Sequence, residues 1–336
     1  MAITAKDLAK MLDLSESAIS LALNNRPGVS TATRKRVIEA AKANGYDFSR
    51  LEFTKPSQVQ GSIYFVIYKK HGAVVADTPF FSEVSEGVDL TCKRLSYYLN
   101  IQYLHEEDDI EALLADWRRV GCRGIILLGT EMQARDLDPF LGTDIPLVLL
   151  DNYFEELCVN SVLINNIQGA YIATDYLIRK CKTQPGYLHS SYSINNFEER
   201  ADGFYKAIRK HGMSTSRSVV HRLTPSVEGA YADMKELLSQ NEPRANCYFA
   251  DNDLIAAGAA RAFKEAGYRI PQDIAIVGFD NMPVSTYIEP PLTTIHVPKQ
   301  YMGQAAVKRL HELITVPDSL PVKLEICTSL KKRKSC

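Results

Sequence analysis

Four side chains near the start of the chain are of the types that read the edges of DNA bases. They are Glu16, Ser17, Ser20 and Leu21. A glutamate carboxylate can accept a hydrogen bond from cytosine N4, serine hydroxyls can bond bases or phosphates, and a leucine can contact the methyl group of thymine. The same pattern suits the solvated face of a helix with no role in DNA binding, so the neighbouring elements have to decide between the two interpretations.

A second group of polar residues falls where short helices are expected to begin or end. Backbone amides and polar side chains at helix ends commonly hold phosphate groups. The members of this group are Thr4, Ser15, Asn24, Thr33 and Arg34. They would fix the position of a DNA backbone without reading its sequence.

Three short helices in the first 46 residues would position both groups. Thr4, Ser15 and Ser30 are each placed to cap one of them, and the second helix is expected over residues 16–23. Two helices joined by a three-residue turn, with a third closing the core, form a helix-turn-helix arrangement. Residues 1–60 also hold nine Lys or Arg against six Asp or Glu, a net charge of +3 in a chain of net charge −1. A basic head on an acidic body suits a polyanion bound at one end.

Residues 47–60 lack periodicity and are interpreted as a hinge or linker, and beyond them apolar strand-type runs alternate with amphipathic helical stretches. Strands are expected near 63–68, 101–104, 124–128, 147–150, 162–164, 186–189, 247–250 and 274–279. Helices are expected near 81–97, 107–120, 167–180, 197–211, 228–240, 252–267 and 298–314. This alternation predicts parallel sheets with helices on both faces, and about 270 residues exceed what one core usually supports. We therefore expect two α/β lobes with a cleft between them.

The composition excludes several classes of protein and site. The seven cysteines include no Cys-x-x-Cys pair and the seven histidines form no cluster, so we expect neither a metal site nor a bound cofactor. No apolar run approaches the roughly 18–20 residues of a membrane span, and the first residues lack the apolar stretch of a signal peptide. We expect a cytoplasmic protein in a reducing compartment, with no membrane partner.

Taken in order, a series of motifs resembles the lactose-repressor (LacI/GalR) family of transcriptional regulators over nearly the whole chain. In the head these are Ala5–Ala9, Leu14–Ser15, Ala18–Ser20, Leu23–Asn24, Val29–Ser30, Thr33–Arg34 and Gly45–Tyr46. In the body they are Pro79–Phe81, Arg200–Phe204, Asn252–Asp253, Ala257–Gly258, Val277–Asp280 and Pro291–Ile295.

The resemblance implies a helix-turn-helix DNA-binding domain (1–46), a hinge (47–60) and an effector-binding core (61–336). The core would resemble periplasmic sugar-binding proteins, with two doubly wound parallel sheets and three crossings between lobes. Placing the crossings near 164, 290–296 and 322 gives lobe one as 61–163 plus 296–321, and lobe two as 164–295 plus 322–336. The family also implies a homodimer that reads a pseudo-palindromic double-stranded DNA operator. We expect a dimer and no larger assembly, since no tetramerising tail follows the last expected strand.

The family's effector pocket carries over to four polar positions, Asp151, Arg200, Asn252 and Asp280. Their carboxylates, amide and guanidinium can pair with the hydroxyls of a sugar or sugar derivative, and Phe80 and Phe81 could supply an apolar wall. Each assignment has a structural alternative. The Phe pair could be core packing, and Asp280 could only close a turn. Arg200 could pair on its own helix with Glu198, Glu199 or Asp202.

Two positions depart from the family pattern. Leu21 stands where many members carry Arg, so a guanine contact is lost there. In the hinge, Lys55 takes the place of a leucine that wedges into the minor groove, and Pro56 follows it. Leu51 or Phe53 could act as a substitute wedge. Alternatively, the hinge could act only as a tether, and the sequence does not separate these two possibilities.

Among three classes of function, the sequence favours the regulator. An enzyme on this fold would need a nucleotide or nucleophile motif, and no Gly-x-Gly-x-x-Gly, Walker loop or Gly-x-Ser-x-Gly is present. A secreted binding protein would have no need of the head. We therefore expect a transcriptional repressor whose operator affinity depends on a small polar effector. The identity of the effector, and whether it induces or co-represses, stay open.

Overall fold

The computed structural model describes residues 3–23, 28–46, 60–75, 79–316 and 318–336, and they form two compact units, residues 1–60 and 61–336. The first unit contains α1 (Ala5–Leu12), α2 (Glu16–Leu23) and α3 (Thr31–Ala43). Their apolar faces meet in a small core that includes Leu8, Ile19 and Val37. The unit is thus the three-helix bundle that the sequence predicts.

The expected capping residues begin these helices. Thr4 caps α1 in a reciprocal arrangement with Asp7: the Asp7 N–H donates to Thr4 Oγ1 and the Thr4 N–H to the Asp7 carboxylate. Ser15 Oγ accepts a hydrogen bond from the N–H of Ala18 and so caps the start of α2. These bonds satisfy amides that have no partner within the helix. Three residues, 13–15, separate the end of α1 from the start of α2.

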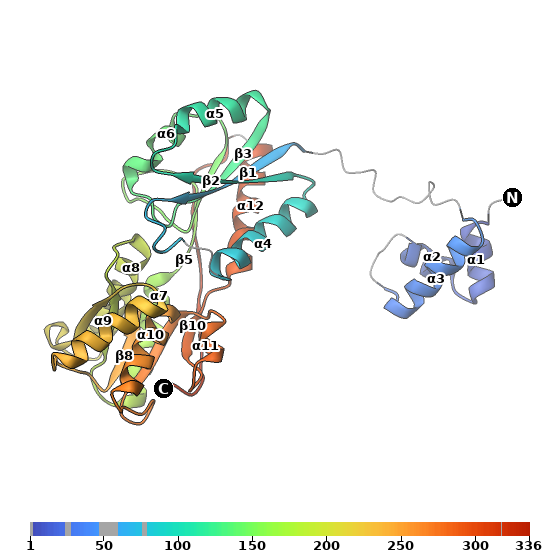
Figure 1. The fold of residues 1–336 in the computed structure, drawn as a ribbon. Helices are drawn as coiled ribbons and strands as arrows, with labels where there is room; N and C mark the ends of the chain where they lie inside the picture. Colours follow the sequence, from blue (N-terminus) through green and yellow to red (C-terminus); the bar gives the residue numbers. More distant parts are fainter. Residues whose placement is uncertain (1–2, 24–27, 47–59, 76–78, 317) are drawn as a thin grey trace. The chain divides into compact units, whose positions relative to one another are not determined.

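The second unit is built on two six-stranded sheets, one in each lobe (Figure 1). The lobe-one sheet has the order β11-β5-β4-β3-β1-β2 and its pairs are parallel. The lobe-two sheet has the order β12-β10-β9-β8-β6-β7, in which only the pair of β12 with β10 is antiparallel. The lobe-one strands are β1 (Ser62–Lys69), β2 (Tyr98–His105), β3 (Cys122–Leu128), β4 (Leu147–Leu150), β5 (Ser161–Ile164) and β11 (Lys323–Ile326). The lobe-two strands are β6 (Gly186–Ser190), β7 (Val220–Leu223), β8 (Cys247–Ala250), β9 (Ala275–Asp280), β10 (Thr293–His296) and β12 (Ser329–Lys331).

Helices cover both faces of each sheet, because alternate residues along the strands point to opposite sides. Lobe one has α4 (Pro79–Arg94) and α12 (Lys299–Thr315) on one face, and α5 (Ile110–Arg119) and α6 (Asp138–Leu141) on the other. Lobe two has α7 (Asn166–Cys181) and α8 (Asn195–Lys210) on one face, and α9 (Val227–Ser239) and α10 (Asp253–Glu265) on the other, with the short α11 (Val284–Tyr287) following β9. This is the doubly wound arrangement expected from the sequence.

Close packing of α4 on α12 depends on two glycines. A Cβ on Gly87 would lie 2.0 Å from the carbonyl oxygen of Gln300, and one on Gly303 would lie 2.3 Å from that of Val84. Because Gly87 and Gly303 carry no side chain, the backbones of the two helices can come into direct contact. This contact holds together segments that are more than 200 residues apart in the chain.

The third crossing between the lobes differs from the expectation. β11 pairs in parallel with β5 over Lys323–Ile326, so residues 322–326 belong to lobe one, and the chain returns to lobe two only before β12. The boundary placed at 322 was therefore wrong. The strand was missed because its burial is confined to Ile326, which leaves no apolar run to mark it. The first two crossings lie between β5 and α7 and between β10 and α12.

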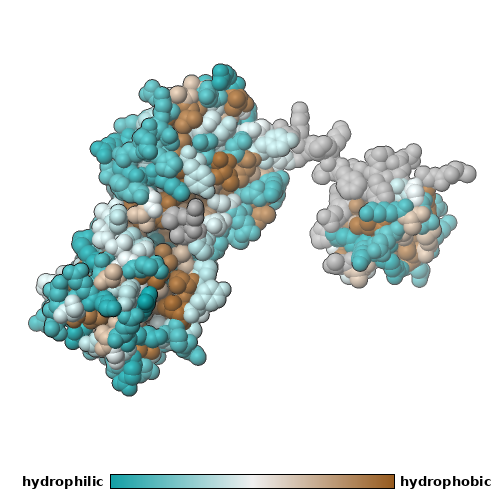
Figure 2. Space-filling view, in the orientation of Figure 1, coloured by the Kyte–Doolittle hydropathy of each residue, from teal (hydrophilic) through white to brown (hydrophobic). Residues whose placement is uncertain are grey.

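Within the described residues, no helix is both long enough and apolar enough to cross a membrane. Hydrophilic side chains cover most of the face of the second unit seen in Figure 2, and hydrophobic ones gather in separate patches.

Candidate effector and DNA sites

Asp151 stands immediately after β4, at the carboxyl edge of the lobe-one sheet. Its backbone is left-handed, with φ of 65°, and its side chain is buried. Thr130 follows β3 at the same edge and donates to Asp151 Oδ2 over 2.7 Å, while Asn196 on α8 donates to it over 3.2 Å. Asp151 therefore joins lobe one to a helix of lobe two.

Arg200 occupies the same helix one turn beyond Asn196 and is held on three sides. Its Nε donates to Asn166 Oδ1 over 2.9 Å, its Nη1 to the carbonyl oxygen of Asp251 over 2.5 Å, and its Nη2 to Asp280 Oδ1 over 3.3 Å. The guanidinium carbon also lies 3.9 Å from the ring centre of Phe279. A guanidinium has five N–H groups, so these three bonds leave donors to spare for a ligand.

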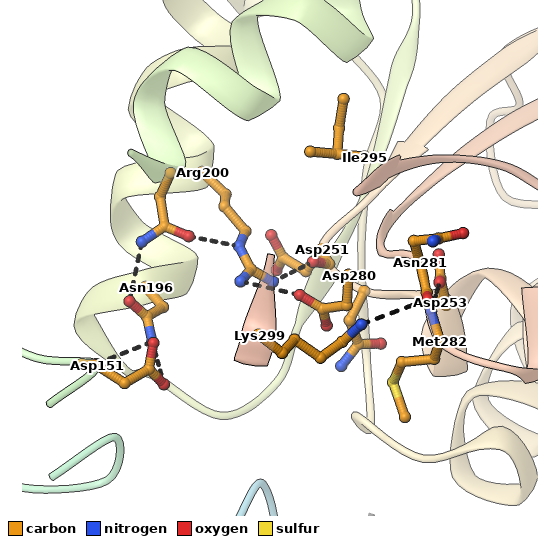
Figure 3. A network of polar contacts seen from close by, with 12 residues as sticks. Asp151, Asn196, Arg200, Asp251, Asp253, Asp280, Asn281, Met282, Ile295 and Lys299 are labelled. Atoms are coloured by element: carbon orange, nitrogen blue, oxygen red, sulfur yellow. Dashed lines mark hydrogen bonds and ion pairs between the residues drawn. The ribbon is translucent and has the colours of Figure 1, made fainter. Parts of the chain in front are cut away.

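Asp280 and Asn252 lie at the carboxyl ends of two neighbouring strands of lobe two, β9 and β8. Ligands bind at such strand ends in open α/β sheets. Asp280 is the last residue of β9, and Asn252 caps α10 by accepting from the N–H of Ile255 over 2.8 Å. Figure 3 shows Lys299, at the start of α12, close to Asp280, with a dashed line from its Nζ to Asn281, the residue after Asp280. Lys299 is buried and donates to the carbonyl oxygen of Asn281 over 3.4 Å.

One cavity of about 260 Å³ between the lobes brings the six expected effector residues together. Phe80, Phe81 and Asp151 come to it from lobe one, and Arg200, Asn252 and Asp280 from lobe two. Other residues in its wall, which the sequence interpretation missed, include Thr130, Asn196, Phe197, Ser226 and Glu228. Two of these could have been found. Thr130 follows a strand end just as Asp151 does, and Asn196 lies four residues before Arg200, on the same face of one helix.

The structure also bears on the alternatives for these residues. Arg200 pairs with Asp280 and not, within the described residues, with Glu198, Glu199 or Asp202. Phe80 and Phe81 pack in the apolar core and also line the cavity, so core packing and a place in the cavity wall are compatible. The Asp280 carboxylate faces the cavity and bonds to Arg200, so it does more than close a turn.

Burial raises the pKa of two carboxyl groups in the cavity, Asp151 and Asp280. It raises the pKa of Asp151 to about 6, although the hydrogen bond from Thr130 and the charge of Arg200 act in the opposite direction. Burial also raises the pKa of Asp280, against the charges of Arg200 and Lys299. A ligand hydroxyl that donates to either carboxylate would favour its ionised form.

A wider cavity of about 470 Å³ adjoins the first and shares Val74 and Ile194 with it. Carboxylates predominate in its wall, at Glu131, Glu155, Glu156, Glu198, Glu199 and Asp202, with Lys70 and His71 as the basic residues. Lys70 is already paired with Asp136, at 2.8 Å. This wider cavity is therefore unfavourable for an anion.

Glu131 holds the loop that forms one wall of these cavities. Its Oε2 accepts the backbone N–H groups of Lys70, His71 and Gly72 over 3.0 Å each, and its Oε1 accepts those of Val74 and Val75 over 2.8 Å each. Burial disfavours the charge, but the five donors more than offset this and lower the pKa of Glu131. Residues 70–75, which follow β1, are thus organised around one carboxylate.

In the head, the structure exposes three of the four residues expected to read bases. Glu16, Ser17 and Ser20 lie on the exposed face of α2, and Leu21 is half-buried. Thr4, Ser15 and Thr33 stand at helix starts, and Arg34 is half-buried on α3. Asn24 and the hinge residues Leu51, Phe53, Lys55 and Pro56 lie outside the described residues.

Comparisons with known proteins agree with this architecture. Residues 174–336 match a family model described as a periplasmic binding protein-like domain. The chain is 30% identical to the HTH-type transcriptional repressor PurR of Mannheimia succiniciproducens, over 99% of this chain and 98% of that protein. It is also 30% identical to the ribose operon repressor of Haemophilus influenzae, over 94% and 93% of the two chains.

Two solved structures show the same fold. A complex of the transcriptional regulator CelR with cellobiose has a TM-score of 0.73 and 24% identity, and covers 99% of this chain and 100% of its own. A regulator from Enterococcus faecium with bound ribose has a TM-score of 0.69 and 26% identity, and covers 81% of this chain and 98% of its own.

Proposed function

This chain belongs to the LacI/GalR family of transcriptional regulators, and on that premise we propose that the cavity between its lobes binds the small molecule that controls its affinity for operator DNA. The protein is a DNA-binding transcriptional repressor and not an enzyme. The observation that carries the proposal is the convergence of Phe80, Phe81, Asp151, Arg200, Asn252 and Asp280, from both lobes, on one cavity.

The chemistry of the cavity favours an uncharged ligand rich in hydroxyl groups, a sugar or sugar derivative. Asp151 and Asp280 can accept from hydroxyls, whereas Arg200 and the Asn252 amide can donate to them. The aromatic rings of Phe80 and Phe81 offer an apolar wall to the carbon face of a sugar ring. A volume of about 260 Å³ is small for a ligand pocket and suits a single ring.

The control of DNA binding would follow from a shift between lobe arrangements. Because the cavity takes residues from both lobes, a ligand that binds one arrangement more tightly increases its population. Because the hinge leads from the head into β1 of lobe one, a change in lobe angle would be passed to the two heads of a dimer and to their fit to adjacent major grooves. A coupling of roughly 1–3 kcal/mol would change operator affinity about 5–150-fold.

The protein acts as a homodimer on a pseudo-palindromic operator, and we place this activity in the cytoplasm. Lobe one offers a face for self-association. β2 is an edge strand of its sheet, and it exposes Tyr98, Ile101 and Tyr103, while α4 exposes Leu90. An unpaired strand edge with apolar side chains is normally covered in the assembled protein.

The proposal is tested by a thermal-shift screen of the full chain against ribose, galactose, glucose, their phosphates, nucleosides and amino acids. A ligand at about 100 times its Kd should raise Tm by roughly 5–10 °C. A hit is repeated with Asp280→Asn and Phe81→Leu, and with Asp144→Asn as an exposed control in the same lobe as Phe81. We expect the shift to be lost in the first two variants and kept in the third.

The same ligand is then added to the protein bound to operator DNA selected from a random duplex library. Operator affinity should change by at least fivefold, in either direction. A ligand whose shift survives both Asp280→Asn and Phe81→Leu would place the effector site elsewhere. A ligand that binds the cavity and leaves operator affinity unchanged would refute the coupling.

A further inference from the structure

Three cysteines that are far apart in the sequence meet in lobe two. Cys181 is the last residue of α7, Cys247 is the first of β8, and Cys336 follows β12. The thiols of Cys247 and Cys336 both lie within hydrogen-bonding reach of the Cys181 thiol. All three pack on the same apolar core of the lobe. The spacing of the cysteines in the sequence gave no sign of this cluster.

The backbone on both sides of the cluster is anchored, so the contact is part of the fold. α7 ends with Lys182 in a left-handed conformation, whose N–H donates to the carbonyl oxygen of Ile178 over 2.9 Å. Next to Cys336, the Ser335 hydroxyl donates to the carbonyl oxygen of Ile276 over 2.6 Å and accepts from the N–H of Thr293 over 2.8 Å. Cys181 and Cys336 are therefore held beside each other.

Two of the three thiols can be reached from solvent. Cys181 and Cys336 line a surface cavity of about 700 Å³, together with Lys180, Arg244 and Asp273, whereas Cys247 is fully buried behind them. This cavity shares no lining residue with the interlobe cavity. A small oxidant can thus meet Cys181 and Cys336 without entering the effector site.

The surroundings also make the three thiols unequal. Hydrogen bonds from Cys247 and Cys336 lower the pKa of Cys181, with a smaller contribution from the charge of Lys180, whereas the pKa values of Cys247 and Cys336 are raised. The thiolate is the reactive form of cysteine. Because Cys181 and Cys336 line the same surface cavity, an oxidant can reach Cys181, and Cys336 is the neighbour placed to resolve an oxidised Cys181.

We propose that Cys181 and Cys336 form a thiol redox site that a hydroperoxide converts to an intramolecular disulfide. The Cys181 thiolate attacks one peroxide oxygen, the O–O bond breaks, and hydrogen peroxide leaves as hydroxide, which a proton converts to water. The Cys336 sulfur then attacks the sulfur of the resulting sulfenic acid, and a second water leaves as the S–S bond forms. Two thiols lose two electrons and two protons in total, and the peroxide takes up both.

The disulfide would join the end of α7 to the segment after β12, two parts of lobe two that follow the first and third crossings. Closing so long a loop restricts the unfolded chain, so oxidation should raise Tm by roughly 5 °C. This inference is independent of the effector cavity and of which ligand binds there.

The test treats the full chain with hydrogen peroxide, blocks remaining thiols with a maleimide, and maps disulfides by mass spectrometry after chymotryptic digestion without reduction. We expect a cross-linked pair of peptides, one containing Cys181 and the other Cys336. It should be absent from Cys181→Ser and Cys336→Ser and present in Cys158→Ser, because Cys158 is exposed and outside the cluster. Circular dichroism checks that the variants are folded.

One outcome would overturn the proposal: oxidation that joins molecules through Cys158 or Cys327 and leaves Cys181 and Cys336 as free thiols.

Discussion

The guanidinium of Arg200 and the carboxylate of Asp280 lie 3.3 Å apart in the wall of the interlobe cavity, although eighty residues separate them in the chain. Both side chains are at least nine-tenths buried, and Figure 3 shows them between Asn196 on one side and Lys299 on the other. Removing either partner of a buried ion pair leaves the other charge buried without compensation, and this lowers the stability of the fold.

Replacing Arg200 with methionine should therefore lower the free energy of unfolding by about 3–5 kcal/mol, because Asp280 is left buried without its partner. Urea unfolding followed by circular dichroism measures the change. Arg179→Met is the matched control, since Arg179 on the neighbouring α7 pairs with Asp175 at the surface and should contribute less than about 1 kcal/mol. Equal losses of unfolding free energy in the two variants would show that the buried ion pair contributes no more to stability than the surface pair.

Stability should depend on pH through Asp151. Because its pKa is raised to about 6, the folded protein keeps a proton between about pH 4 and 6 that the unfolded chain releases. The contribution of Asp151 to the unfolding free energy should thus fall by about 3 kcal/mol as pH rises through this interval. Asp151→Asn should remove this part of the fall, to which the raised pKa of Asp280 also contributes, and Asp144→Asn, at an exposed carboxylate, should leave it unchanged. The prediction fails if the difference between wild type and Asp151→Asn is the same at pH 4 and pH 7.

Glu131→Gln tests the loop between β1 and α4. The amide that replaces one carboxylate oxygen is a donor and would face backbone N–H groups, so at least two buried donors lose their acceptor. We expect a loss of about 3 kcal/mol in unfolding free energy and faster hydrogen exchange confined to residues 70–75. Gln133→Glu, at a neighbouring exposed position, is the control. Unchanged exchange in this loop would mean that its order does not come from Glu131.

In the DNA-binding head, Glu16→Ala should change which operators are preferred. Loss of one base contact reduces discrimination at one base pair by about 1–3 kcal/mol, while removal of a negative charge raises affinity for every sequence. Fluorescence anisotropy over duplexes with single changes in a half-site measures both effects. Glu39→Ala, on the exposed face of α3, removes the same charge and should leave the preferences unchanged. Identical preference profiles for wild type and Glu16→Ala would remove Glu16 from the base-reading surface.

Most of the architecture could be predicted from local pattern. Buried strands such as β1, β4 and β8 are continuous apolar runs, and caps such as Thr4 and Ser30 mark where helices begin. Several strands were not expected. β11 is exposed at three of its four residues and β7 at alternate residues, so their strand conformation depends on pairing with β5 and β6 and leaves little trace in composition. β10 is buried but only four residues long, and it was missed as well.

The sequence by itself determined the three-helix head, the alternating strands and helices of two lobes, and six polar and aromatic positions that line one cavity. Only the tertiary structure decided what these positions touch. In the folded protein Arg200 pairs with Asp280, and Asp151 accepts hydrogen bonds from Thr130 and Asn196. Glu131 accepts hydrogen bonds from backbone amides, and Cys181 lies beside Cys336. Local propensity acts over a few residues, whereas these contacts join segments from different strands and helices, so they exist only once the sheets and helices have packed.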